Sequence, residues 1–373
     1  MLHLSINKQI MFRYLLLAAF YVTAVSSQAQ IEINASDFPG ERDTVRYSNA
    51  LDFTIDYSAT GEDYFWNFSD LNPDSQTLIN HLSVDDADNL TQAYFGPFVM
   101  PAYRATYYLP ATAIPFEDLG QFVSIPIENF YRFYRKTSSE LNVIGLSLSS
   151  GGYGLGSRSD TIETAYQFPM QFGQQFNSRG YTAIDMSIAV PAQIKQYRQR
   201  ESEVDGYGEL MTPYGTFDVL RVHNRIHELD SVYFEVSGFG QWFALPVPVR
   251  NEYQWWTNGQ KGAVLEVITN EIAGQEQVTE VRYRDNYRAD LVASVEEGKV
   301  EALQIYPNPV ADKLFVKGAD SESHLTIYTA SGQVLLEESY TTQGVNLSDW
   351  ESGVYYVKIT TGDHIVIKSF VKE

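Results

Sequence analysis

Short apolar runs separated by turn-forming residues fill the C-terminal end of the chain, residues 304–373. Tyr355, Val357 and Ile359 occupy alternate positions, so in a strand their side chains lie on one face. Short strands at this spacing, with turns such as 317–320 and 361–363 between them, predict a small β-sandwich. The apolar runs lie at 314–316, 325–328, 334–336, 345–347, 354–359 and 365–371.

The same segment carries local motifs in a recognisable order. It opens with Ile305-Tyr306-Pro307-Asn308-Pro309-Val310, continues through Ser331-Gly332-Gln333-Val334 and Gly353-Val354-Tyr355-Tyr356-Val357-Lys358, and closes on Phe370-Val371-Lys372-Glu373. This order resembles the type A C-terminal sorting domain of the type IX secretion system. The residues that carry the resemblance are Tyr306, Pro307, Asn308, Pro309, Gly332, Gly353 and Tyr355.

The resemblance implies an immunoglobulin-like sandwich that the type IX translocon reads and its sortase removes. The body would pass through the periplasm of a Gram-negative bacterium. It would then be secreted, or attached to lipopolysaccharide at the cell surface.

The N-terminus predicts a secretory signal peptide over residues 1–29. Lys8 and Arg13 precede an apolar run over 14–25, which is too short to span a bilayer as a stable helix. The run is followed by Ser27-Gln28-Ala29, a small-x-small cleavage pattern, so we expect cleavage after Ala29. Met11 is an alternative start, because Arg13 alone still supplies a charged lead. No later apolar run is long enough for a transmembrane helix, so we expect no transmembrane segment in the mature chain.

Charge and cysteine content limit the function classes. The net charge is −21, and removing residues 1–29 makes the chain more acidic still. Phosphates would repel such a protein, which argues against nucleic acid as a partner. Cysteine is absent, which excludes thiol nucleophiles, zinc–thiolate sites and iron–sulfur clusters. We expect no cofactor.

The body, residues 30–292, also predicts β-structure, and a polar linker at 293–303 separates it from the sorting segment. Alternation predicts strands at 52–57, 181–188 and 264–268. We therefore expect an all-β protein with a large antiparallel body. A division into two subdomains near 130–160 is an alternative to one large sheet. The run 151–156 predicts a surface turn.

Three segments of the body, 66–71, 204–222 and 253–267, are similar to the bodies of uncharacterised proteins that carry the same sorting tail. The middle segment also resembles, faintly, a strand pair in half-barrels of the lipoprotein-carrier type. Neither resemblance implies an activity.

One strand pattern runs against the acidity of the chain. Arg221, His223, Arg225 and His227 alternate with apolar residues, so they share one face of a strand. They could bind a carboxylate or sulfate ligand, but we favour pairing with acids on a neighbouring strand, such as Glu201 and Glu203. In a strand His223 and His227 lie about 13 Å apart, too far to share a zinc ion.

Other motifs are weaker. Asp85-Asp86-Ala87-Asp88-Asn89 could bind calcium but lacks the glycine and the distal glutamate of the calcium-loop motif, so we favour a solvated acidic turn and predict no metal site. No G-x-S-x-G motif or recognisable triad exists. The many acidic residues leave a glycosidase-type pair of carboxylates as an open alternative. Trp255-Trp256 could stack on sugars but is more typical of a core.

The sequence therefore favours an exported protein whose body is a non-enzymatic surface or binding module. The alternatives are an extracellular hydrolase acting on polysaccharide or protein, and a half-barrel that carries an apolar ligand.

Overall fold

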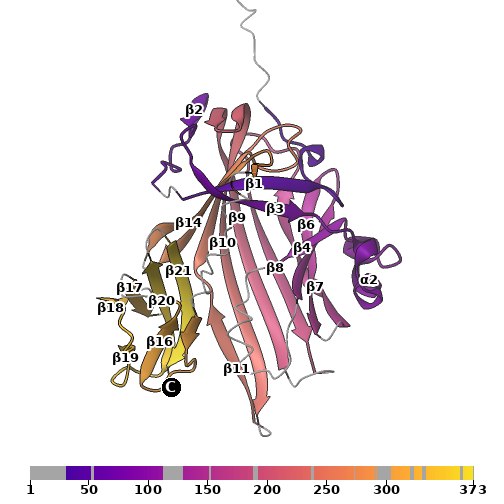
Figure 1. Ribbon diagram of the computed structural model, residues 1–373. Coiled ribbons are helices and arrows are strands. Elements are labelled where there is room, and N and C mark those ends of the chain that lie inside the picture. The colour runs from indigo at the N-terminus through magenta and orange to yellow at the C-terminus, as the bar shows by residue number, and fades with distance from the viewer. Residues whose placement is uncertain are drawn as a thin grey trace, which may run out of the picture. The chain divides into compact units, whose positions relative to one another are not determined.

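The computed structural model describes residues 31–51, 54–111, 129–150, 153–187, 192–236, 239–272, 274–289, 291, 304–319, 323–329, 333–361 and 364–372. The expected signal peptide, the expected linker and Gly332 lie outside these residues. The body and the C-terminal tail are described separately (Figure 1). The chain is all-β, as predicted.

The described body forms one 14-stranded sheet, which is antiparallel except for the parallel pair β2–β9. The order along the sheet is β3-β1-β14-β13-β12-β10-β9-β8-β7-β6-β5-β4, and β11 and β2 pair with β10 and β9 outside this path. The strands are β1 (Thr44–Ala50), β2 (Tyr64–Asn67), β3 (Pro73–Asn80), β4 (Tyr107–Pro110), β5 (Asn129–Lys136), β6 (Glu140–Ser150), β7 (Tyr153–Gln167), β8 (Gln175–Asp185), β9 (Ala192–Thr212), β10 (Gly215–Val236), β11 (Phe239–Pro246), β12 (Val249–Trp256), β13 (Leu265–Ile272) and β14 (Gln275–Arg284).

Helical structure in the described body is short. It consists of η1 (Ala35–Asp37), η2 (Val84–Asp86), α2 (Asn89–Phe95) and η3 (Pro101–Tyr103).

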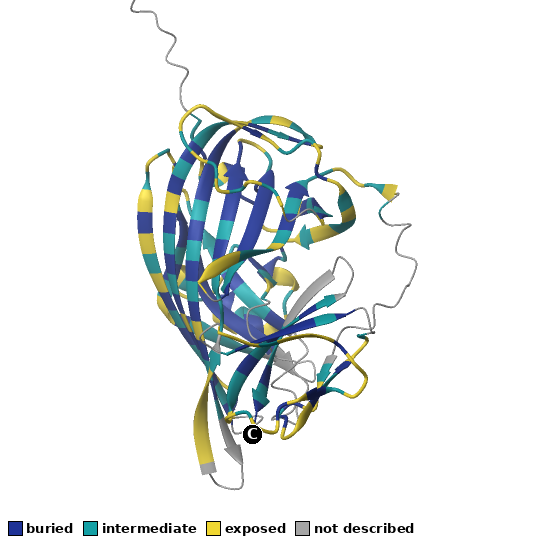
Figure 2. Cartoon of the chain, turned by 90° about the vertical axis from the view of Figure 1, so that its left-hand side faces the viewer, coloured by how far each residue is buried: buried dark blue, intermediate teal, exposed yellow. Residues whose placement is uncertain are grey.

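Two long strands, β9 and β10, run through the middle of the sheet. A two-residue turn, Pro213-Tyr214, joins them, and their pairing extends from Thr212–Gly215 to Ala192–Phe234. Buried and exposed positions alternate along β9, and Figure 2 shows this alternation on the neighbouring strands as well. The two faces of the sheet therefore differ in burial, and one of them is turned inward.

The sheet curls until its edge strands meet. Leu82, just after β3, forms an antiparallel bridge with Tyr108 of β4, with N–O distances of 3.1 and 3.0 Å. Because β3 and β4 are the two ends of the strand order, this bridge closes the curl. The concave face is thereby enclosed by strands from every part of the body.

The segment between β1 and β3 covers part of the convex face. Trp66 is buried against Trp255, with ring centroids 6.0 Å apart, and Tyr57 packs against Tyr253 at 4.8 Å. The strand predicted over 52–57 is wrong for residues 54–57, which have no regular secondary structure. Their alternating apolar side chains instead pack on the sheet from outside without pairing with it. Residues 153–156, predicted as part of a turn, begin β7; residues 151–152 lie outside the described ranges.

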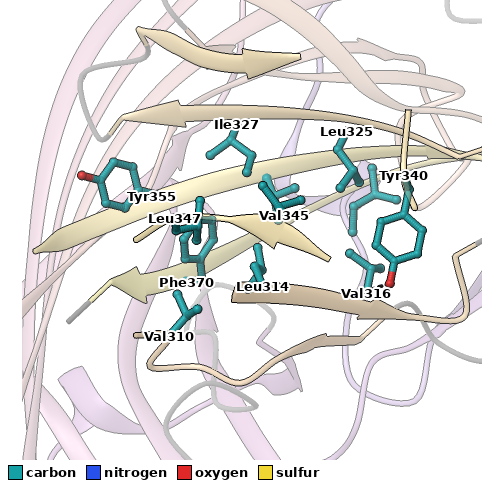
Figure 3. Packing of buried hydrophobic residues seen from close by; sticks show 12 residues of the cluster. Val310, Leu314, Val316, Leu325, Ile327, Tyr340, Val345, Leu347, Tyr355 and Phe370 are labelled. Carbon is teal, nitrogen blue, oxygen red and sulfur yellow. Dashed lines mark hydrogen bonds between the residues drawn. The ribbon is translucent and has the colours of Figure 1, made fainter. Parts of the chain in front are cut away.

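The tail forms two facing sheets, β15-β16-β19 and β18-β17-β20-β21. Each predicted apolar run lies in one of these strands, except that Leu347 comes just after the end of β19, and Ile305-Tyr306 adds β15. Figure 3 shows the apolar core of the tail, which includes Leu314 from the first sheet and Ile327 and Phe370 from the second. The sheets therefore form the predicted sandwich. Its strands are β15 (Gln304–Tyr306), β16 (Lys313–Lys317), β17 (His324–Thr329), β18 (Val334–Ser339), β19 (Val345–Asn346), β20 (Gly353–Thr361) and β21 (His364–Lys372).

Candidate functional site: a charged cavity on the concave face

The inward face of β9 carries polar side chains between apolar ones. Alternate residues of β9 point to the same face and are all buried. They include Ile194, Gln196, Arg198, Arg200 and Val204. Burying a charged side chain is costly unless it is paired, so these arginines need partners on the concave side of the sheet.

Two adjoining cavities lie on this concave side, with volumes of about 730 Å³ and about 230 Å³; we call them the large and the small cavity. The strands that line them come from both halves of the sheet order, so they exist because the sheet curls. The large cavity lies within the size range of small-molecule sites. Both cavities are lined by Arg132, Tyr134, Arg198, Arg250, Glu252 and Arg282.

Glu163 of β7 joins the two arginines of β9. Its carboxylate accepts from Arg198 Nε at 2.9 Å and from Arg200 Nε at 2.8 Å. Burial opposes ionisation of this group, but the two guanidinium groups prevail and lower the pKa of Glu163 to about 2. Arg198 also pairs with Glu228 of β10. The buried charges of β7, β9 and β10 therefore neutralise one another.

Further ion pairs continue across β12 and β14. Glu252 accepts from Arg250 Nε at 2.9 Å and lies 3.6 Å from Arg200 Nη1. Burial raises the pKa of Glu252, but Arg250 and Arg200 outweigh it and hold the pKa below its ordinary value. Arg282 pairs with Glu266, and with Glu280 at 2.9 Å. Four of the arginines that line the cavities thus have carboxylate partners.

Arg132 of β5 differs from these four. Its Nη2 donates to the neutral amide oxygen of Gln196 at 3.0 Å, and its Nε is buried without a hydrogen-bond partner. Within the described ranges, no carboxylate lies within ion-pair distance of its guanidinium. Arg132 lines both cavities, so a guanidinium without a direct carboxylate partner faces them.

Asp230, on the inward face of β10, is fully buried. Neither of its carboxyl oxygens has a hydrogen-bond partner among the residues that the structure describes. Burial, and then the nearby charge of Glu228, raises the pKa of Asp230 to about 8. At neutral pH this carboxyl group is therefore mostly uncharged and does not neutralise Arg132.

Aromatic and amide side chains complete the wall of the small cavity. Trp256 stacks on Phe38, with centroids 3.9 Å apart, and its Nε1 donates to Gln254 Oε1 at 3.2 Å. Tyr166 also donates to Gln254, which links β7 to β12. Of the tryptophan pair singled out in the sequence, Trp255 is buried in the convex-face cluster and Trp256 lines the small cavity.

The basic stripe lies on the convex face of β10, away from the cavities. Arg225 binds Glu271 through two hydrogen bonds, at 2.7 and 3.0 Å, while Glu201 is 3.9 Å away. His223 stacks on Tyr253 and contacts Asn251 at 3.0 Å, and His227 Nε2 lies 2.6 Å from Arg225 Nη1. The alternation and the strand were predicted correctly. Anion binding by this stripe stays the less favoured alternative to such pairing.

Arg221 departs from the partly solvated row that the alternation predicts. Only 1% of its surface is exposed. It pairs with Asp205, donates to the backbone oxygen of Tyr57 at 2.6 Å, and lies over the rings of Tyr253 and Trp255. The irregular segment that follows β1 covers it, which the pattern of β10 alone does not reveal.

The acidic turn at 85–89 is occupied by local hydrogen bonds. Asp88 caps α2 by accepting from the backbone N–H groups of Leu90 and Thr91, at 2.9 and 3.0 Å. Asp86 accepts from Arg42 at 3.3 Å. Among the described residues, no group of three histidine, aspartate or glutamate side chains is arranged to hold a metal ion.

The motif that opens the tail ties its first segment to its last strand. Asn308 is buried; its side chain accepts from Val371 N at 2.7 Å and donates to Ser369 O at 3.4 Å. Tyr306 stacks on Phe315, and Tyr355 stacks on Phe370 and donates to Glu351 O at 2.8 Å. These motif residues therefore hold the sandwich together.

Comparison with known families decides the role of the tail. Residues 304–373 match the family described as the secretion system C-terminal sorting domain. The protein is a type IX secretion substrate. This system exports it to the cell surface or the exterior of a Gram-negative bacterium. In the part of the chain that the structure describes, no helix is both long and apolar enough to span a membrane.

Other comparisons give little information about the function of the body. No curated protein matches the chain. A solved structure of PorZ from Porphyromonas gingivalis, described as an essential surface component of the type IX secretion system, matches with 7% identity and a TM-score of 0.19. The match covers 72% of this chain but only 57% of PorZ. A likeness this weak carries no argument about the body.

The residues that line the cavities were not singled out from the sequence. A signal for two of them exists, because Arg198 and Arg200 share the parity of buried Ile194 and Val204 in one strand. Arg132, Arg250 and Arg282 have no comparable signal, since their strands lie far apart in the chain.

Proposed function

We propose that the body is a non-enzymatic binding module that the type IX system delivers outside the cell, and that the large cavity binds a small polar ligand. The observation that carries this proposal is a cavity of about 730 Å³ whose wall combines apolar side chains with charged ones held by ion pairs. Ion pairs hold the lining side chains in place, which limits the entropy lost when a ligand binds.

The nature of the lining favours this reading over an apolar carrier. A carrier of apolar ligands needs a dry wall of aliphatic and aromatic groups. The wall of the large cavity includes apolar side chains such as Leu109 and Ile226, but it also presents charged groups: Arg132, Arg198, Glu228, Arg250 and Glu252. An apolar ligand would desolvate these charges without replacing their contacts with water.

A hydrolase is also less well supported. A glycosidase-type site needs a carboxylic acid that can donate a proton and a second carboxylate near it. The four glutamates that line the cavities, Glu228, Glu252, Glu266 and Glu280, each pair with an arginine. Arg250 and Arg200 hold the pKa of Glu252 below its ordinary value, which suits binding better than proton donation. Burial raises the pKa of Glu280, and Asp230, whose pKa is also raised, does not line either cavity.

Delivery follows the usual scheme of the sorting family in this proposal. The N-terminal signal directs the chain to the periplasm, the translocon reads the tail, and its sortase removes it. The body is then released or attached to lipopolysaccharide.

A cavity-filling variant tests the binding proposal. Leu109 of β4 lines both cavities, so Leu109→Trp places a larger apolar side chain in the enclosed volume. Leu90→Trp makes the same change at an exposed position of α2 and serves as the control. We expect equilibrium dialysis against a mixture of neutral, acidic and basic metabolites, read by mass spectrometry, to show retention by the wild type and by Leu90→Trp. Retention should fall at least about tenfold for Leu109→Trp. Equal retention by both variants, or none by the wild type, would refute the proposal.

A further inference from the structure

We infer that the ligand of the large cavity carries an acidic group, and that Arg132 receives its negative charge. This inference rests on the proposed binding function. It identifies the ligand as a small organic acid, since the cavity of about 730 Å³ is far larger than one carboxylate needs.

The first step is a comparison among the lining arginines. Arg198, Arg200, Arg250 and Arg282 each have a carboxylate within 4 Å. Arg132 has only the neutral amide of Gln196, so among the described lining arginines it alone lacks a counter-charge. Arg132 is half-buried and its buried Nε has no hydrogen-bond partner, so a partly desolvated cation stands there without a direct counter-ion, which is unfavourable. A bound anion removes that cost.

The second step asks whether a neighbouring acid supplies the charge. Glu228 is the nearest candidate on β10, but it accepts from Arg198 and from Gln196 Nε2 at 3.1 Å. Asp230 lies beside it, and burial raises the pKa of Asp230 to about 8. Glu163 also interacts with the charge of Arg132, but its two oxygens accept directly from Arg198 and Arg200. Arg132 therefore has no carboxylate in direct contact.

The third step concerns geometry. Gln196 uses one of the five N–H donors of the Arg132 guanidinium, and Arg132 itself lines both cavities. A planar guanidinium matches a carboxylate through paired, charge-assisted hydrogen bonds and also accepts phosphate. The fixed contact with Gln196 holds the guanidinium in place before the ligand arrives.

Matched acids and amides provide the test. The probes are acetate, succinate and glutarate, their neutral counterparts acetamide, succinamide and glutaramide, and inorganic phosphate. All are measured by equilibrium dialysis at constant ionic strength against the wild-type protein. Direct binding avoids the general stabilisation that such salts give to any folded protein. We expect at least one acid to bind at least about tenfold more tightly than its amide. Phosphate separates a phosphate ligand from a carboxylate one.

Two arginine variants locate the charge. Arg132→Gln should weaken binding of the acid by at least about tenfold, whereas Arg132→Lys should retain part of it. Arg179→Gln removes an exposed arginine of β8 that lines neither cavity and should bind like the wild type. The comparison of acids with amides needs no variant, so it stands even if Arg132→Gln fails to fold.

Several outcomes overturn the inference. They are equal binding of acids and amides, no binding of any acid probe, and unchanged acid binding by a folded Arg132→Gln. One further result would overturn this inference but leave the proposed binding function intact. In that result the wild type and Arg132→Gln retain neutral metabolites, and Leu109→Trp does not.

Discussion

The substitution Asp230→Asn should stabilise the protein above neutral pH. Asp230 is fully buried, and neither carboxyl oxygen has a hydrogen-bond partner within the described structure. Burial is the main cause that raises its pKa from 3.8 to about 8, and the charge of Glu228 adds to it. Asparagine has nearly the same shape and never ionises, so the variant avoids the cost of burying a charge.

The sign and size of the effect follow from proton linkage. Between pH 4 and pH 8 the folded protein keeps a proton on Asp230 that the unfolded chain releases, so the free energy of unfolding falls as pH rises. Each pKa unit corresponds to about 1.4 kcal/mol. Four units therefore cost the wild type on the order of 5 kcal/mol by pH 8, and almost nothing at pH 4. The variant should be more stable than the wild type by up to this amount at pH 8 and nearly equal to it at pH 4.

Urea unfolding at pH 4, 6 and 8, followed by tryptophan fluorescence, measures the difference. Four of the five tryptophans lie in the body, so the signal reports mainly on the large sheet. Asp218→Asn makes the same change at an exposed position of the same strand and controls for the substitution itself. Two results would refute the reasoning. In one, the difference in free energy of unfolding between Asp230→Asn and the wild type does not grow with pH. In the other, the variant is less stable than the wild type at pH 8.

Four further predictions concern sorting and stability. Deleting residues 301–373 should leave the protein in the periplasm, which fractionation and immunoblotting measure. Residues 30–292 expressed alone should unfold cooperatively, with a midpoint in urea that EDTA does not change. Asn308→Ala should cost the sandwich about 1–3 kcal/mol, because it leaves the N–H of Val371 without its partner, and should speed limited proteolysis of the tail. Arg221→Ala should cost about 3–5 kcal/mol in urea unfolding, since it strands the partner of a buried ion pair, whereas the partly exposed pair of Arg225 is worth under about 1 kcal/mol.

Each of these four predictions has an outcome that would contradict it. Normal export of the truncated protein would contradict the sorting role. A fall in the unfolding midpoint on adding chelator would favour the calcium-binding alternative for residues 85–89. Unchanged proteolysis of Asn308→Ala would contradict the part assigned to the buried amide. Equal losses for Arg221→Ala and Arg225→Ala would contradict the difference in burial between them.

The fold of the tail was predictable because neighbouring residues in the sequence determine its strands and turns. Strands such as β16 and β20 are short apolar runs bounded by turn residues, and the core of the sandwich is made almost wholly from those runs. The same reasoning recovered β10 and the two faces of its middle segment. It failed at 54–57, where alternating apolar residues cover a sheet instead of joining it.

The cavity was not predictable because its residues meet only through the curl of the sheet. Arg132, Arg250 and Arg282 lie on β5, β12 and β14, and each strand taken alone shows polar residues that would suit a solvated face. Their burial depends on the order of the strands and on the closure of the sheet. The residue pattern of a single strand gives no information about either.

The pairing of β1 with β14 bears on the time at which the protein can fold. Ser48 and Asp285 are 237 positions apart in the chain, yet their side chains share a hydrogen bond of 2.6 Å. β1 lies between β3 and β14, so the earliest strand of the body finds its second neighbour only after the last has been made. Contacts so distant in sequence slow folding, because loop-closure entropy must be overcome before they form. The sheet therefore cannot be completed before the chain has been made as far as β14, directly ahead of the linker and the sorting tail.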